Sequence, residues 1–253
     1  MASSKSPAMG RRRTSRQVLV QSLPQIINVV PQLSSVKSCA MIGCGHGNTD
    51  LEFVSRCLPN VEKLTAVEPD AGELAALKTR VSQLLPNVST EFCHETAQSW
   101  TGTDQQFDAV LLFHCLYFIP QLERAALFKK LFDNVVAKGG LAFIITSSCN
   151  LENLGTFSEL IDLLGLWSYS KMDVVDVNHV RDMMTSVGFR HCYQLSTEFQ
   201  TDAQEPNEDL MTLLVHWSGG KLSQEKVRET VTESLAGEKY HRDDMWFGVF
   251  QKP

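Results

Sequence analysis

The chain has 253 residues, 43% of them hydrophobic and 21% charged, and a formal net charge of −6 at pH 7. This composition is typical of a globular protein, and a mildly acidic chain has no general attraction for nucleic acid or anionic membranes. No run of about 18 apolar residues predicts a membrane-spanning helix. The seven cysteines are scattered singly, which favours a reduced cytoplasmic protein without a metal site. We further expect a monomer, with residues 1–20 as a flexible arm and 21–253 as a single domain.

Between residues 38 and 147, short apolar runs alternate with segments of helical periodicity. Strands are expected over 38–42, 64–67, 88–93, 107–113 and 141–146. Helices are expected over 48–58, from Asp70 to about residue 84, and over 121–136. Asn48 or Thr49 is expected to cap the start of the first helix and Asp70 the start of the second. Lys138, Gly139 and Gly140 are expected to end the third helix. Such alternation predicts a doubly wound α/β fold, because parallel strands need crossover helices.

After residue 147 the pattern becomes looser, and the remaining elements read as additions to the same domain. A helix is expected over 174–187, and strands over 189–195 and 245–251. The segments 148–173 and 200–237 are expected to be partly helical insertions that cover a ligand site. The sequence therefore predicts a mostly parallel, seven-stranded, Rossmann-like sheet. Ligands of such sheets lie beyond the carboxyl ends of the strands.

A glycine-rich turn follows the first predicted strand. Its spacing, Gly43-x-Gly45-x-Gly47 and then Asn48, differs from the G-x-G-x-x-G of dinucleotide-binding domains. It suits a ligand with an amino-acid tail and an adenosine, which needs close approach of the backbone but no diphosphate cradle. Glu68 ends the second strand, where a carboxylate can accept hydrogen bonds from both ribose hydroxyls. The alternative is a purely structural turn and a surface glutamate.

Three further residues stand where an adenine ring would reach. Thr96 and Ala97 follow the third strand, and a hydroxyl or backbone group there can bond the exocyclic amine. Phe113 ends the fourth strand and would either pack on the ligand or close the core. For Thr96 and Ala97 the alternative is an ordinary loop.

These segments, together with the run 107–118 (FDAVLLFHCLYF), resemble class I methyltransferases that use S-adenosylmethionine (SAM). More narrowly, the chain is similar to the histamine N-methyltransferase family, including its carnosine-methylating relatives. That similarity covers roughly residues 20–200. It is carried by short motifs, namely residues 23–27 (LPQII), 67–69 (VEP), 94–96 (HET), 116–118 (LYF), 147–148 (SS) and 188–189 (GF).

The resemblance implies a SAM site and a site for a small amine. On the donor side, Gly43, Gly45 and Gly47 would line the methionyl part and Glu68 would bind the ribose. Glu73 stands where the family has a glutamine near the donor, Thr96 and Ala97 would border the adenine, and Phe113 would lie on its stacked side. On the acceptor side, His114 replaces the family's glutamine that meets the imidazole, Tyr117 and Phe118 match its aromatic pair, and Asp243 replaces an asparagine that faces the substrate amine.

The chain departs from the family mainly in its acceptor half. The N-terminal segment RRRTSRQVLV lacks the family's aromatic residues and glutamate, and the family's tryptophans are not evident near Leu151 and Leu154. The leading hypothesis is therefore an N-methyltransferase for an imidazole or another biogenic amine. The alternatives are a methyltransferase for an oxygen or sulfur nucleophile, a non-catalytic SAM-binding partner, and, disfavoured by the glycine spacing, a nicotinamide-dependent oxidoreductase.

Methyl transfer from a sulfonium needs orientation of the two reactants and exclusion of water. His114 is expected to accept a proton or hold the nucleophile, since histidine ordinarily titrates near neutral pH. Asp243 would pair with a cationic end of the substrate, and Tyr117 and Phe118 would stack on its ring. The alternatives are a satisfied core histidine, a solvated turn before the last strand, and packing at the start of a helix.

Overall fold

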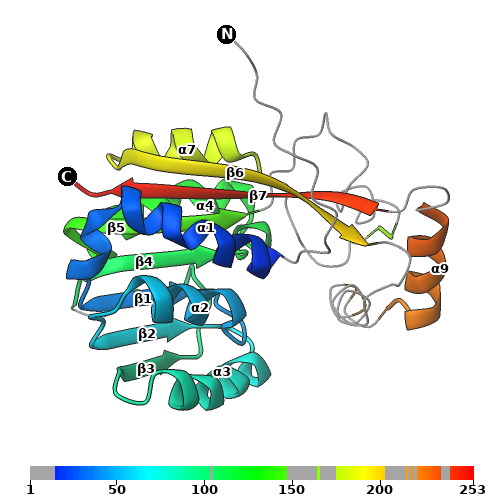
Figure 1. Ribbon diagram of the computed structural model, residues 1–253, viewed down its shortest axis with the longest axis horizontal. Coiled ribbons are helices and arrows are strands. Elements are labelled where there is room, and N and C mark those ends of the chain that lie inside the picture. The colour runs from blue at the N-terminus through cyan, green and yellow to red at the C-terminus, as the bar shows by residue number, and fades with distance from the viewer. Residues whose placement is uncertain are drawn as a thin grey trace, which may run out of the picture.

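The computed structural model describes residues 15–102, 105–146, 164–165, 175–202, 215, 218, 221–234 and 240–253. Their strands form a seven-stranded sheet in the order β3-β2-β1-β4-β5-β7-β6 (Figure 1). The strands are β1 Ser38–Ile42, β2 Lys63–Val67, β3 Ser89–Cys93, β4 Phe107–Phe113, β5 Val136–Thr146, β6 Arg190–Asp202 and β7 Tyr240–Gln251. The helices are α1 Ser15–Val29, α2 Asn48–Cys57, α3 Ala71–Leu84, α4 Gln121–Lys130, α7 Val177–Ser186 and α9 Gln224–Ser234, with the short turns η1 Pro31–Ser35, η2 Leu116–Phe118 and η3 Leu131–Val135.

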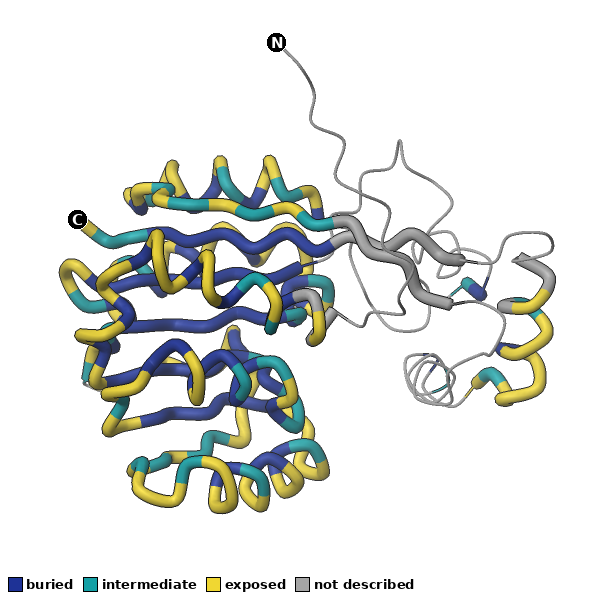
Figure 2. The backbone as a smooth tube through the Cα atoms, in the orientation of Figure 1, coloured by how far each residue is buried: buried dark blue, intermediate teal, exposed yellow. Residues whose placement is uncertain are grey.

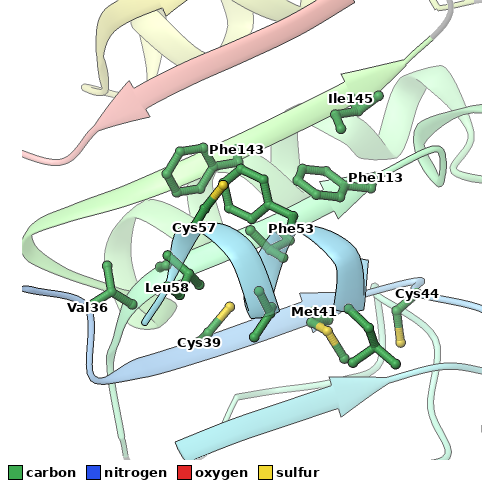
Figure 3. Packing of buried hydrophobic residues seen from close by; sticks show 14 of the residues in the cluster. Val36, Cys39, Met41, Cys44, Phe53, Cys57, Leu58, Phe113, Phe143 and Ile145 are labelled. Carbon is green, nitrogen blue, oxygen red and sulfur yellow. The ribbon is translucent and has the colours of Figure 1, made fainter. Parts of the chain in front are cut away.

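Alternate side chains of the central strands enter two separate cores, as expected for a sheet that is covered on both faces. Met41 and Leu111 pack under α1, α2 and α3, whereas Ile42 and Leu112 pack against α4 and α7. Figure 2 shows the central strands buried along their length, with the exposed positions on the outer sides of the helices. In Figure 3, Phe53 of α2 lies among the rings that rise from β4 and β5.

The strand order reverses between β1 and β4, which pair in parallel with Met41 opposite Leu111. The chain leaves β1 toward β2 and β3 on one side, and later continues from β4 toward β5 on the other. Beyond β1 and β4 the chain therefore runs to opposite sides of the sheet, and ligands of doubly wound sheets bind at this point. The glycine turn and His114 come directly after these two strands, so the fold brings both to this switch point.

The predicted doubly wound, seven-stranded fold is confirmed, and all five strands expected before residue 147 are present. Several boundaries were wrong. The N-cap of α2 is Gly47 in a left-handed conformation, not Asn48 or Thr49. Asp70 does cap α3, because its side chain accepts the Glu73 N–H at 2.9 Å. The helix expected to reach Val136 ends as α4 at Lys130, and a π-turn follows it.

Errors at the two ends of the chain have clear physical reasons. Residues 15–20 belong to α1, and Leu19 is fully buried, so the expected arm cannot extend to residue 20. β7 begins at Tyr240 rather than at 245, because it pairs with a β6 that continues to Asp202. Most of the expected insertions at 148–173 and 200–237 lies outside the described residues, although α9 falls within the second. Among the described residues, no helix is long and apolar enough to cross a membrane.

Candidate functional site

The turn after β1 has a backbone that strongly favours glycine at three positions. Gly43, Gly45 and Gly47 have φ angles of 62°, 52° and 77°, in the left-handed region that glycine adopts without steric cost. A methyl group on Gly43 would also lie 2.6 Å from Cβ of Cys115, directly after β4. The first glycine thus lets the loops at the switch point meet without a side chain between them.

Glu68 connects the end of β2 to the glycine turn. Its Oε2 accepts the Gly45 N–H at 2.8 Å and its Oε1 accepts the Asp70 N–H at 2.9 Å. The side chain is only 7% exposed, and this burial raises the pKa of the Glu68 carboxyl above its ordinary value. Each carboxylate oxygen has two lone-pair directions, so capacity remains for the hydroxyls of a ligand. The pairing of glycine turn and acidic strand end, predicted from sequence, is a real contact.

A polar network closes the outer side of the turn. Nδ1 of His46 lies 2.6 Å from Oε2 of Glu73. The other ring nitrogen of His46 contacts the Asn48 amide, which in turn accepts a hydrogen bond from Arg80 of α3. Glu73, predicted to lie near the donor, therefore stands at the rim of the site and fixes the His46 ring. His46 was not singled out from the sequence, since nothing in the local pattern shows that α3 reaches it.

The loop after β3 is held in place by hydrogen bonds from its own side chains and from α4. The Thr96 N–H donates to Oγ of Ser99 at 3.1 Å, and the Ser99 N–H donates to Oγ1 of Thr96 at 3.0 Å. Lys130, at the end of α4, holds this loop by donating to the carbonyls of Ala97 at 2.7 Å and Trp100 at 2.6 Å. Sequence reasoning missed Lys130, because its partners are about thirty residues away and are backbone atoms.

His114 follows β4 in a conformation that is rare for a residue with a side chain, at φ 53°. Its N–H donates to the Ile145 carbonyl at 2.8 Å, which holds the backbone to β5. Its Nδ1 lies 2.6 Å from the Tyr117 hydroxyl. Within the described residues, its buried Nε2 has no hydrogen-bond partner. Buried polar atoms normally have one, and unpaired ones together with backbone strain concentrate at functional sites.

Burial lowers the pKa of His114 from 6.5 to about 4. This corrects the expectation that the ring titrates near neutral pH. A neutral imidazole offers one hydrogen bond through Nε2, as donor or acceptor according to its tautomer, but it does not carry a second proton at pH 7. His114 is consequently suited to orienting a substrate atom rather than to storing a proton.

The remaining predicted residues take different positions. Phe113 packs edge-to-face on Phe53, with ring centroids 5.4 Å apart, on the α2 side of the sheet, so its ring is part of the core. Tyr117 and Phe118 lie in η2 with rings nearly perpendicular at 5.7 Å, and Phe118 is 45% exposed. Asp243 lies within β7 opposite Phe199, not in a turn before it. Because Trp246 pairs with Thr146 at the carboxyl end of β5, Asp243 extends beyond the same edge of the sheet as the site.

Comparisons with known proteins identify the class of domain that contains these residues. A family model described as a methyltransferase domain matches residues 40–140, which contain the glycine turn, Glu68 and His114. The chain carries a class I SAM-dependent methyltransferase domain. No curated protein matches the chain by sequence. Within the described residues, no group of three or more His, Cys, Asp or Glu side chains is placed to hold a metal ion.

Solved structures share the fold of this methyltransferase. A candidate methyltransferase of Bacillus halodurans has a TM-score of 0.66 at 17% identity, over 92% of this chain and 98% of that one. A mycolic acid cyclopropane synthase in complex with SAH has a TM-score of 0.60 at 12% identity, over 91% and 84%. A geranyl diphosphate methyltransferase in complex with SAM has a TM-score of 0.58 at 9% identity, over 92% and 85%. Their named activities differ, so the shared fold does not specify the methyl acceptor.

The glycine turn and Glu68 fit SAM. The position of a side chain on Gly45 has no protein atom nearer than 3.7 Å, so a ligand chain can lie against the backbone there, and the buried Glu68 carboxyl accepts the Gly45 N–H. When bound, SAM supplies the electrophilic methyl group. The residues of the chain supply the shape of the pocket and the hydrogen bonds that orient the two reactants.

Proposed function

We propose that the protein is an N-methyltransferase for a small imidazole-containing or related biogenic amine. The observation that carries this proposal is the neutral, buried His114 beside the glycine turn, with Nε2 unpartnered and Nδ1 held by Tyr117. A side chain that forms one hydrogen bond and brings no charge complements a polar, uncharged group of the acceptor. The family resemblance of the segments around residues 67–69 and 116–118 supports the same acceptor class.

The low pKa of His114 restricts which nitrogen is methylated. The attacking nitrogen needs a free lone pair, and His114, with a pKa of about 4, is a poor base for removing a proton from an alkylammonium group. An aliphatic amine with a pKa near 10 is almost wholly protonated at pH 7, whereas an imidazole with a pKa of about 6.5 is mostly neutral. We therefore infer that the acceptor atom is a ring nitrogen, with the other ring nitrogen bonded to Nε2 of His114.

Tyr117, Phe118 and Asp243 complete this acceptor proposal. The aromatic pair on η2 offers two ring faces in different orientations, since the rings of Tyr117 and Phe118 lie at 79° to each other and Phe118 is partly exposed. The position of Asp243 beyond the carboxyl end of β5 favours a role in pairing with the cationic chain of the amine. Such a pairing would orient the ring without touching the transferred methyl group.

A screen with isotopically labelled SAM tests the proposal. Candidate acceptors include histamine, other imidazoles, aliphatic amines, phenols and thiols, and we expect transfer to imidazoles at a ring nitrogen. His114→Ala should lower kcat while SAM affinity stays nearly unchanged, and His114→Gln should retain part of the rate because an amide can also form the hydrogen bond. Transfer only to phenols or thiols would contradict the acceptor class. Binding of SAM without transfer to any nucleophile would support a non-catalytic partner instead.

A further inference from the structure

Lys130, the last residue of α4, binds the loop after β3 through three backbone carbonyls. Its Nζ donates to the carbonyls of Ala97 at 2.7 Å, Gln98 at 3.2 Å and Trp100 at 2.6 Å. An ammonium group has three N–H donors, so these bonds use all of them. A lysine in the last turn of a helix ordinarily serves the carbonyls of its own helix or stays in water. Here a side chain of α4 instead determines which way the carbonyls of a distant loop face.

Hydrogen bonds connect the start of this loop to the glycine turn. The Cys93 carbonyl, at the end of β3, accepts the Glu68 N–H at 3.0 Å. Oε2 of Glu68 in turn accepts the Gly45 N–H at 2.8 Å. Further along the loop, Ala97 is buried in the core cluster that also contains Cys115, the residue that meets the first glycine of the turn. The loop therefore begins directly beside the carboxylate that fits the donor.

The bonds to Lys130 also fix the orientation of the N–H groups of the loop. In a planar trans peptide the C=O and the N–H of the next residue point in opposite directions. The Ala97 carbonyl faces Lys130, so the Gln98 N–H points away from it. The N–H groups of Thr96 and Ser99 are taken by each other's side-chain oxygens, which hold the shape of the turn. An N–H that points away from α4 suits an acceptor atom of a planar base, such as a ring nitrogen of adenine.

We propose that Lys130 is a positioning residue for the donor, which fixes the loop after β3 so that its backbone recognises the adenine ring. The inference rests on SAM as the donor and on adenine lying beside residues 96 and 97, and it is independent of the acceptor. Bonds from a charged donor are stronger than neutral ones. Without the ammonium group, the partly buried carbonyls of Ala97 and Trp100 lose their partner, and the loop is released. The loss then falls on recognition of the base.

Calorimetric titration with S-adenosylhomocysteine and S-inosylhomocysteine tests this role. The two ligands differ only in the base, because hypoxanthine has an oxygen in place of the exocyclic amine and carries a hydrogen on the adjacent ring nitrogen. Its donors and acceptors on that edge are therefore reversed. We expect wild type to bind the adenine ligand about tenfold more tightly, the range for an unsatisfied buried polar group. Lys130→Met should weaken the adenine ligand about fivefold and change the hypoxanthine ligand by less than about twofold.

Two further variants separate positioning from general support of the fold. Lys130→Arg keeps a cationic donor and should retain most of the preference for adenine. The control Lys129→Met removes the neighbouring, exposed lysine of α4, which pairs with Asp133 at 2.7 Å, and should match wild type. If Lys130→Met does not fold, Lys130→Gln gives the same comparison with a shorter, uncharged side chain, and it should lose the preference as well.

Three results would overturn the proposal. Equal affinity of the wild-type protein for the two ligands would do so without any variant. An equal loss of affinity for both ligands on replacement of Lys130 would show that this residue only supports the fold. Unchanged affinities would show that the loop does not depend on it. Failure of the folded wild-type protein to bind S-adenosylhomocysteine would instead contradict the donor assignment, and the inference with it.

Discussion

Replacement of His114 by glutamine should make the folded protein more resistant to acid. In the folded state burial lowers the pKa of His114 from 6.5 to about 4, so on acidification the unfolded chain takes up a proton at this residue first. The stability contribution of the neutral ring is complete above pH 6.5 and is lost as the pH falls toward 4. Each unit of pKa difference between the folded and unfolded states corresponds to 1.36 kcal/mol. The lowered pKa of His114 therefore removes about 3 kcal/mol from the free energy of unfolding once the pH is well below 4, and about 2.5 kcal/mol at pH 4.5.

Urea unfolding at pH 7.5 and pH 4.5 measures this difference. Other titrating groups contribute equally to wild type and His114→Gln, so the difference between the two proteins in the loss of unfolding free energy from pH 7.5 to pH 4.5 is due to His114. We expect the variant to lose about 2–3 kcal/mol less than wild type. His179→Gln replaces an exposed histidine of α7 and should behave as wild type. Equal losses in wild type and His114→Gln would refute the buried, neutral state of this ring, and with it the inference about a ring nitrogen acceptor.

Further predictions concern the donor half of the site. Glu68→Gln should weaken SAM binding by about 1.5–3 kcal/mol, the usual range for charge-assisted hydrogen bonds. Glu62→Gln, which changes an exposed acid directly before β2 that pairs with Lys37, should have no effect in the same titration. Gly43→Ala should abolish measurable SAM binding and lower the unfolding midpoint more than Gly139→Ala, because both positions have positive φ but only the methyl group at Gly43 meets another atom, Cβ of Cys115. Similar midpoints for the two alanine variants, or a normal donor affinity of Glu68→Gln, would contradict the geometry described for the turn.

The sequence predicted the central sheet well, because its strands are short apolar runs set between helices of clear periodicity. Phe107–Phe113 was predicted to the residue, and the capping role of Asp70 followed from its position before an apolar helical stripe. Boundaries were less predictable where tertiary pairing decides them. β6 and β7 extend each other outward to Asp202 and Tyr240, a pairing that no local pattern indicates.

The site shows the same division between local and non-local features. The glycine turn and Glu68 were predictable, because backbone freedom and an acidic strand end leave local marks in the sequence. Lys130 was not, because a lysine at the end of a helix is common on solvated surfaces. Only the structure shows that Lys130 reaches the carbonyls after β3.

The central claim is that the turn at residues 43–47 and the carboxyl of Glu68 bind the adenosyl sulfonium donor. Equilibrium titration of the purified protein with SAM, beside a parallel titration with a nicotinamide dinucleotide, tests it most directly. We predict saturable binding of one SAM per chain and no binding of the dinucleotide. Binding of the dinucleotide, or no binding of SAM by the folded protein, would contradict the account.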